Sequence, residues 1–276
     1  MSVGAAVLRG ARSAYLRTAS LPPVRRRLAP HLDGLDRPFR YTLRGAGIEH
    51  TLPLGDVSGR TVLVLGVGGA DELADWERLA ARHVVGTDLQ PSETWRAGAP
   101  RASFLCADGA HLALSADSVD VVTSRSVLEH VLDLDGFLDE SARVLTRDGI
   151  FHAVFGPLWH TFGGSHVAEL GYDHLLLDGE AVLAEARAVG HGWEHWLELD
   201  LFNRLRLDDY LAAIERRFIV ERLVIADSRE GRRFRAEHPD EWKRLLAAHA
   251  ERDLLVRLVS VVARRRSAVE ATSTVV

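Results

Sequence analysis

Residues 62–71 read VLVLGVGGAD, and this stretch decides the fold. An apolar, β-branched run that stops at glycines is typical of a strand buried on both faces of a parallel sheet. Glycines in the following turn let the backbone approach a ligand closely, because no side chain blocks it. A dinucleotide fingerprint starting at Gly66 would need a small residue where the chain has Asp71, and no phosphate-binding GxxxxGK[ST] loop occurs. The stretch therefore predicts a ligand site at a strand end that is not built for a phosphate.

Outward from this strand, short apolar runs alternate with stretches of helical spacing. Five strands are predicted at 61–67, 83–89, 102–107, 119–124 and 150–155, and two more at 218–226 and 254–263. The stretches read as helices include 128–145, 207–217 and 239–252, and one that carries Leu73, Trp76 and Leu79 on one face. This alternation predicts an α/β protein with a doubly wound, mostly parallel seven-stranded sheet and helices on both faces.

Two segments interrupt the rhythm. Residues 1–52 are rich in arginine and poor in acids, and we interpret them as an N-terminal helical cap, with 53–276 as the main domain. After the fifth strand the pattern breaks at Pro157, and residues 158–204 are rich in His, Gly and Trp without a clear strand. We interpret 158–204 as an insertion that forms a lid over the active-site mouth.

Composition limits the classes of function. The net charge of −5 gives no electrostatic reason to expect a nucleic-acid partner, and no apolar run is long enough to span a bilayer. The single cysteine, Cys106, excludes an intrachain disulfide and a Cys-rich metal site, and we expect it to be buried in an apolar strand. Such cysteine usage suits a reducing compartment, so a cytoplasmic location is expected.

Acidic residues end the second and third predicted strands. Asp88 falls 20 to 22 residues after the glycine turn, where a carboxylate can accept hydrogen bonds from two ribose hydroxyls. Asp108 ends the next strand and is placed to accept from an adenine amino group. The glycine turn, Asp88 and Asp108 lie at three consecutive strand ends. Such a matched set is hard to explain by turn formation alone.

These motifs carry a family resemblance. The sequence continues with SVDVVTS at 118–124, VLEHV at 127–131 and RVLTRDG at 143–149. In this order, after residues 62–68, Asp88 and Asp108, the chain resembles the Rossmann-like class I S-adenosylmethionine-dependent methyltransferases of the small-molecule type. The resemblance covers Val62 to about Pro157 and fits the tail from Leu201 more loosely.

The resemblance implies S-adenosylmethionine as the cofactor. The glycine turn would admit its methionine moiety, the first acid would bind the ribose, and the residues after the second and third strands would contact the adenine. A serine at the end of the fourth strand would lie beside the sulfonium. The cofactor-binding residues implied in this way are Gly66, Val67, Gly68, Asp88, Leu89, Asp108, Gly109 and Ser124. The chain departs from the family pattern at Val64, where an acid is usual, and at Ala70, where a third glycine is usual.

Histidines crowd the predicted acceptor side, and histidine is the natural base near neutral pH. The candidate catalytic residues are His130, His160 and His166, and the candidate substrate-binding residues are Trp159, Tyr172 and His174. Structural roles are open for each of them, and His152, inside a strand, is interpreted as a core histidine. No metal is expected, because spacings of six and eight residues along the insertion are not those of a standard zinc motif.

The function predicted from these features is methyl transfer to a small-molecule acceptor. Oxygen is the expected methylated atom, in bacterial natural-product or cell-surface carbohydrate metabolism. An alternative is a methyltransferase-fold protein that binds the cofactor but catalyses another reaction or acts as a non-catalytic partner, which Val64 and Ala70 favour. A nicotinamide oxidoreductase is disfavoured by Asp71 and by the lack of a Tyr-x-x-x-Lys pair. The expected partner is the acceptor, with neither nucleic acid nor membrane, and a homodimer through residues 1–50 stays open.

Overall fold

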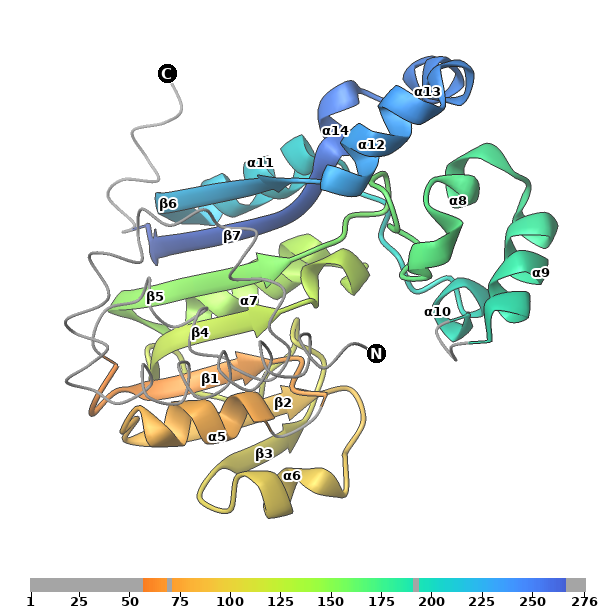
Figure 1. Cartoon of the computed structure of the whole chain (residues 1–276). Coiled ribbons are helices and arrows are strands. Elements are labelled where there is room, and N and C mark those ends of the chain that lie inside the picture. Colours follow the sequence, from red (N-terminus) through yellow and green to blue (C-terminus); the bar gives the residue numbers. More distant parts are fainter. Residues whose placement is uncertain (1–56, 69–70, 191–193, 267–276) are drawn as a thin grey trace, which may run out of the picture. The chain divides into compact units, whose positions relative to one another are not determined.

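The computed structural model describes residues 57–68, 71–190 and 194–266 (Figure 1). The predicted cap at 1–52 lies outside the described residues, as do Gly69, Ala70 and Trp193. The strands are β1 (Thr61–Leu65), β2 (His83–Asp88), β3 (Ser103–Cys106), β4 (Val119–Arg125), β5 (Leu145–Phe155), β6 (Phe218–Asp227) and β7 (Val256–Arg265).

Helices connect these strands and fill the segment after β5. In the described part of the chain, the first four helical elements are α5 (Asp71–Arg78), α6 (Thr94–Gly98), the 3-10 turn η2 (Leu128–His130) and α7 (Leu134–Val144). The segment after β5 holds η3 (Ala168–Leu170), α8 (Asp173–Leu176), α9 (Gly179–Val189) and α10 (His195–Glu198). The last elements are α11 (Leu207–Arg217), α12 (Arg229–Glu237), α13 (Pro239–Leu246) and α14 (Glu251–Leu255).

The seven strands form one sheet in the order β3-β2-β1-β4-β5-β7-β6. β1, β2 and β3 pair in parallel, whereas β6 and β7 pair antiparallel at the far edge. The predicted Rossmann-like α/β sheet is therefore confirmed, and it is a mixed sheet that contains the antiparallel pair of β6 and β7. The described chain divides into two compact units.

Unit 1 comprises described residues 57–123 and 140–152 and contains the glycine turn. Every residue of β1 is buried, as expected for a strand covered on both faces. A Cβ atom on Gly86 of β2 would lie 2.8 Å from Cγ2 of Val67, so a larger residue there would have to displace the side chains beside the turn. Helix α5 packs on β2 through Leu73 and Trp76, which are fully buried at the predicted three-residue spacing.

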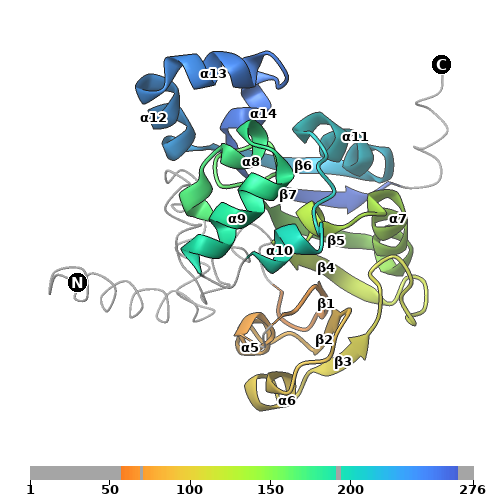
Figure 2. The same ribbon diagram turned by 90° about the vertical axis from the view of Figure 1, so that its right-hand side faces the viewer.

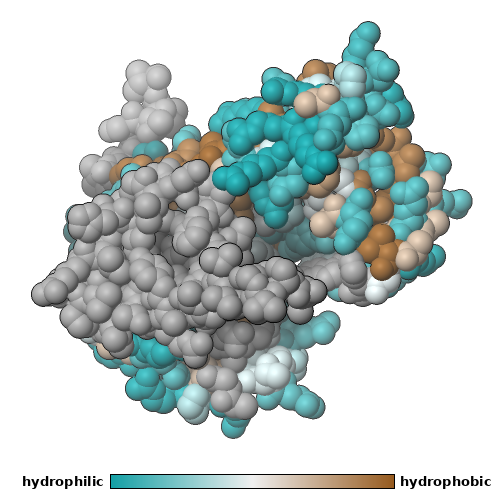
Figure 3. Space-filling view, in the orientation of Figure 1, coloured by the Kyte–Doolittle hydropathy of each residue, from teal (hydrophilic) through white to brown (hydrophobic). Residues whose placement is uncertain are grey.

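Unit 2 comprises Ser124–Asp139 and Ala153–Arg266. Helix α11 packs on β6, and α12, α13 and α14 lie next to one another (Figure 2). Tyr172, Trp242, Leu245 and Leu254 form an apolar cluster at this end of unit 2. Figure 3 shows hydrophilic residues gathered over α12 and α13, whereas Trp242 of α13 is buried in the cluster. Among the described helices none has both the length and the apolar character needed to cross a bilayer.

The buried carbonyl of Leu254 gives a prediction on stability. It accepts hydrogen bonds from the Tyr172 hydroxyl at 2.6 Å and from the Thr161 hydroxyl at 3.0 Å, and both donors are fully buried. Tyr172→Phe or Thr161→Val alone should lower the free energy of unfolding by about 1 kcal/mol, because the other donor still satisfies the carbonyl. Together they should cost roughly 1 kcal/mol more than the sum, because the carbonyl is then left unpaired. Urea unfolding of the four proteins measures this, and strictly additive losses would contradict it.

One predicted helix is shorter than expected. The spacing at 128–145 predicted a single helix, whereas η2 is a separate turn and α7 begins only at Leu134. The reason is a cap: the carboxylate of Asp133 accepts from the backbone N–H of Gly136 at 2.9 Å and starts α7 there. Leu128 is fully buried in the preceding turn, so its apolar character reflected packing and not helical periodicity.

Other expectations are also corrected. Strand β5 begins at Leu145 and not at the predicted residue 150, because α7 ends at Val144 and the chain enters the strand directly. The helix predicted at 239–252 is divided into α13 and α14, and the polar helix α12 was not predicted. Cys106 is exposed and not buried, because β3 is the edge strand of the sheet.

Candidate active site

The glycine turn and the end of β2 are joined by one carboxylate in unit 1. Gly66 and Gly68 have positive φ angles of 73° and 53°, which glycine adopts without steric cost. The backbone N–H of Gly68 donates to Asp88 Oδ2 at 2.8 Å, and the N–H of Leu89 donates to Asp88 Oδ1 at 2.7 Å. Each carboxylate oxygen has a further lone pair, so Asp88 can still accept bonds from a ligand.

Trp95 also holds the glycine turn, and it was not predicted from the sequence. Its indole Nε1 donates to the carbonyl of Gly68 at 3.0 Å, and its ring stacks on Phe104 with centroids 5.1 Å apart. A lone tryptophan in a weakly periodic stretch gives no sequence signal for this contact. The turn is therefore fixed from two sides, by Asp88 and by Trp95.

An exposed surface follows β2 and β3. Leu89 is 69% exposed, which leaves an apolar side chain at the strand end that a flat ring could cover. Asp108 is exposed, and its Oδ1 accepts from the N–H of Ala110 at 2.9 Å, which orders the turn containing Gly109. The strand ends of unit 1 thus place Asp88, Leu89 and Asp108 on the carboxyl edge of β2 and β3. Ser124, near the end of β4, belongs to unit 2, where it is fully buried.

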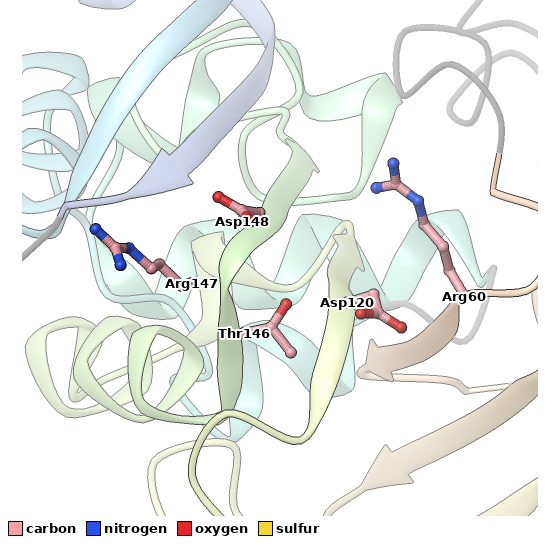
Figure 4. A pocket seen from close by; sticks show the side chains of 5 residues that line it. All are labelled: Arg60, Asp120, Thr146, Arg147 and Asp148. Carbon is pink, nitrogen blue, oxygen red and sulfur yellow. The ribbon is translucent and has the colours of Figure 1, made fainter.

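A hollow of about 460 Å³ lies elsewhere in unit 1, at the starting ends of the strands (Figure 4). It is lined by Arg60, Asp120, Thr146, Arg147 and Asp148. Ligands of open α/β sheets bind outside the carboxyl ends of the strands, so this hollow is on the wrong edge for the predicted site. The Asp120 carboxylate there accepts from the backbone N–H of Thr61 at 2.8 Å and stabilises the start of β1.

Unit 2 contains a buried carboxylate that the sequence analysis did not assign to the site. Glu129, in η2, is 1% exposed, and its Oε1 accepts from the N–H of Gly156 at 3.0 Å. Its Oε2 has no hydrogen-bond partner among the described residues. Burial raises the pKa of Glu129 to about 7, against the smaller effect of its backbone hydrogen bonds. One indication of a role for Glu129 was present in the sequence, which is that it directly precedes the candidate catalytic residue His130.

His130 is held beside this carboxylate by a hydrogen bond and by stacking. Its Nδ1 lies 2.7 Å from the carbonyl oxygen of Leu201, and its ring stacks on Trp196 with centroids 4.1 Å apart. Because a carbonyl only accepts, Nδ1 carries the proton and Nε2 of the neutral ring is an acceptor. Burial lowers the pKa of His130, which favours this neutral form.

His166 meets His130 although the two are far apart in the chain. Their ring centroids are 4.8 Å apart, and His166 has a positive φ of 66°, a conformation uncommon outside glycine. Nε2 of His166 is buried without a partner in the described part of the chain. Burial lowers the pKa of His166 to about 3, so the ring is neutral. Glu129, His130 and His166 offer ligand atoms that all lie within 4.8 Å of one another.

Two further histidines of the insertion, His160 and His174, are engaged by backbone carbonyls. Nε2 of His160 lies 3.0 Å from the carbonyl of Arg204, and Nε2 of His174 lies 2.6 Å from the carbonyl of Trp159. Burial lowers the pKa of His174 to about 4. The Arg204 guanidinium lies 4.7 Å above the Trp159 ring, which the structure places beside His174.

Two predicted residues take structural positions. Tyr172, a predicted substrate contact, lies fully buried in the apolar cluster of unit 2 and donates its hydroxyl hydrogen to the carbonyl of Leu254. His152 of β5 is 1% exposed, and its Nδ1 lies 3.1 Å from the Thr123 hydroxyl, as expected of a core histidine.

Comparisons with known proteins identify the domain around the glycine turn. Residues 63–153 match the family model described as a methyltransferase domain. An uncharacterized methyltransferase of Mycobacterium ulcerans is 35% identical over 139 residues, which are 49% of this chain and 53% of that protein. A Mycolicibacterium smegmatis protein named as an S-adenosylmethionine-dependent methyltransferase is 39% identical over 99 residues, 34% of this chain and 37% of that one. The chain thus spans about half the length or less of these relatives.

Solved structures agree on the fold. The methyltransferase in a complex with the Trm112 methyltransferase activator of Haloferax volcanii has a TM-score of 0.54 at 20% identity, covering 88% of this chain and 98% of that one. An S-adenosylmethionine-dependent methyltransferase of Listeria monocytogenes has a TM-score of 0.52 at 18% identity, covering 81% and 99%. Sheet order, glycine turn, strand-end acid and family match agree, and residues 63–153 of this chain therefore belong to a methyltransferase domain with the fold of the class I S-adenosylmethionine-dependent enzymes.

Proposed function

We propose that the protein transfers a methyl group from S-adenosylmethionine to an oxygen of a small-molecule acceptor. The single observation that carries the cofactor assignment is the Asp88 carboxylate, which receives N–H bonds from both Gly68 and Leu89. A carboxylate held in this way at a strand end is pre-oriented to accept two ribose hydroxyls.

The neighbouring residues complete the proposed donor site. Gly66 and Gly68 admit the methionine moiety, the exposed Leu89 covers one face of the adenine, and Asp108 with Gly109 contacts its edge. Val64, at the position where the family usually has an acid, is fully buried in β1. The methionine end of the cofactor must therefore be held by backbone groups of the turn or by residues outside β1.

On the acceptor side, the proposal uses the cluster of Glu129, His130 and His166 in unit 2. Methyl transfer is an in-line displacement at a carbon activated by positive sulfur, so the protein mainly aligns the acceptor and assists loss of its proton. The cluster offers unpaired acceptor atoms that can address a hydroxyl group. Trp159, half-buried in unit 2 with the Arg204 guanidinium 4.7 Å above its ring, is the proposed contact for a sugar or an aromatic acceptor.

The test is an acceptor screen with a cofactor readout. The full-length protein is incubated with S-adenosylmethionine and hydroxylated sugars, phenols and polyketide-like alcohols, and formation of S-adenosylhomocysteine is measured. Acceptor-dependent S-adenosylhomocysteine together with a methyl ether in the product would support the proposal. Tight cofactor binding with methylation confined to nitrogen or carbon would overturn the oxygen assignment. A protein that binds neither S-adenosylmethionine nor S-adenosylhomocysteine would overturn the activity itself.

A further inference from the structure

The cluster of Glu129, His130 and His166 contains two buried acceptor atoms that nothing in the described chain satisfies. Oε2 of Glu129 and Nε2 of His166 are both buried without a hydrogen-bond partner among the described residues. A buried polar atom without a partner costs roughly 1–3 kcal/mol, and more for a charged one. Two such acceptor atoms in one cluster, both with free lone pairs, favour the binding of a positively charged ligand.

The remaining atoms of the three side chains are already oriented. Oε1 of Glu129 accepts from Gly156, and Nδ1 of His130 donates to the carbonyl of Leu201, which leaves its Nε2 as an acceptor. The other ring nitrogen of His166 bonds the backbone carbonyl of Pro157. Histidines that bind metals almost always donate their second ring N–H to such a carbonyl or carboxylate, which fixes the ring and its tautomer.

We propose that Glu129, His130 and His166 bind a divalent ion of the zinc type through one carboxylate oxygen and two imidazole nitrogens. Their ligand atoms lie within 4.8 Å of one another. Ligand atoms at ~2.0–2.1 Å from a tetrahedral zinc are ~3.3 Å from one another. The distances between the three ligand atoms must therefore shorten by at most about 1.5 Å when the ion binds. A donor set with two nitrogens disfavours magnesium and calcium, which prefer oxygen.

The site leaves one coordination position open. Three protein ligands with a free fourth position are the pattern of catalytic zinc, whereas structural zinc sites have four protein ligands. The three ligands come from two separate segments, η2 and the loop before η3, so spacing within the insertion did not predict the site. The strained backbone of His166 is consistent with a ring held for a ligand.

A role for the ion rests on the proposed function. A hydroxyl bound at the open position becomes more acidic and loses its proton to solvent. The resulting oxygen attacks the methyl carbon, the O–C bond forms as the C–S bond breaks, and the electron pair stays on sulfur to give the neutral thioether. The ion is neither oxidised nor reduced in this step.

The experiment measures zinc binding without any methyl donor. Full-length protein is freed of metal with a chelator, reloaded with Zn²⁺ in competition with a chromophoric chelator, and assayed for bound zinc. One equivalent is expected for the wild type, with affinity lowered at least about 100-fold in Glu129→Gln and in His166→Asn. Glutamine keeps an oxygen for the Gly156 N–H, and asparagine tolerates the positive φ of His166, so both variants should fold. Co²⁺ loading should give the intense visible absorption of a four-coordinate site.

The controls separate this site from other histidines and from the donor site. His249→Gln removes a half-buried histidine that lies next to His160 and outside the cluster, and it should leave zinc affinity unchanged. Asp88→Ala should keep zinc while losing S-adenosylmethionine, and Glu129→Gln should do the reverse. No stoichiometric zinc in the wild type, equal affinity in Glu129→Gln, or loss in His249→Gln instead would each overturn the metal site. The donor assignment would stand in all three cases.

Discussion

Asp88→Ala is expected to weaken the binding of S-adenosylmethionine and S-adenosylhomocysteine by at least about 100-fold. A hydrogen bond to a charged group contributes about 1.5–3 kcal/mol, and the proposed site loses two such bonds from the ribose. The substitution also frees the N–H of Gly68, which Asp88 now holds at 2.8 Å, so the turn itself loses order. Isothermal titration calorimetry with both nucleotides measures the change.

Three further variants sharpen this result. Asp88→Asn keeps the side-chain oxygen but removes the charge, so its loss should be intermediate. Asp108→Ala should cost about tenfold, because one contact to the adenine edge is worth about 1.4 kcal/mol. Asp240→Ala, an exposed carboxylate at the start of α13, should bind both nucleotides like the wild type. A folded Asp88→Ala protein with unchanged affinity would place the cofactor elsewhere.

The closeness of the glycine turn and the strand-end acid could be predicted from the sequence because it depends on local patterns. A strand, its glycine turn and an acid at the end of the next strand are contiguous or separated by one βα unit, so register alone brings Gly68 and Asp88 together. The same reasoning cannot find Trp95, whose bond to Gly68 depends on how the short helix α6 packs.

The acceptor side depends on tertiary packing, and the sequence analysis was less informative there. It named His130, His160 and His166 as candidate catalytic residues and His174 as a substrate-binding one. The structure puts His166 beside His130, while His160 and His174 bond backbone carbonyls. Glu129 was named only as part of the VLEHV motif at 127–131. Its carboxylate is unusual because burial raises its pKa, and burial could not be read from the sequence.

Helix boundaries show the same limit. Periodicity placed 207–217 correctly, since α11 covers Leu207–Arg217 and its buried face is continuous. It failed at 128–145, where the Asp133 cap decides the start of α7, and it missed α12, whose charged sequence has little apolar periodicity. Local polar contacts of this kind override a weak apolar pattern.

The loop that carries His166 should be sensitive to one added methyl group. A Cβ atom on Gly164 would fall on the carbonyl oxygens of Leu158 and Trp159 and lie 2.7 Å from the Trp159 carbonyl carbon. The Trp159 carbonyl cannot move freely, because it accepts from His174 at 2.6 Å. Gly164→Ala should therefore lower the free energy of unfolding by about 3 kcal/mol, the upper end for overpacking. For a domain of this size, the melting temperature should fall by roughly 6–12 °C.

Gly179→Ala is the matched control, since a Cβ at this first residue of α9 meets no atom within 4 Å. It should leave the melting temperature unchanged or raise it slightly, because alanine restricts the unfolded chain. Thermal unfolding followed by circular dichroism compares the two variants with the wild type. Equal melting temperatures for Gly164→Ala and the wild type would mean that the Leu158 and Trp159 carbonyls yield, and that the loop does not fix His166 as firmly as its contacts imply. A lower melting temperature in Gly164→Ala but not in Gly179→Ala would mean that the backbone contacts of Gly164 stabilise the domain. The same contacts position His166 against Glu129 and His130.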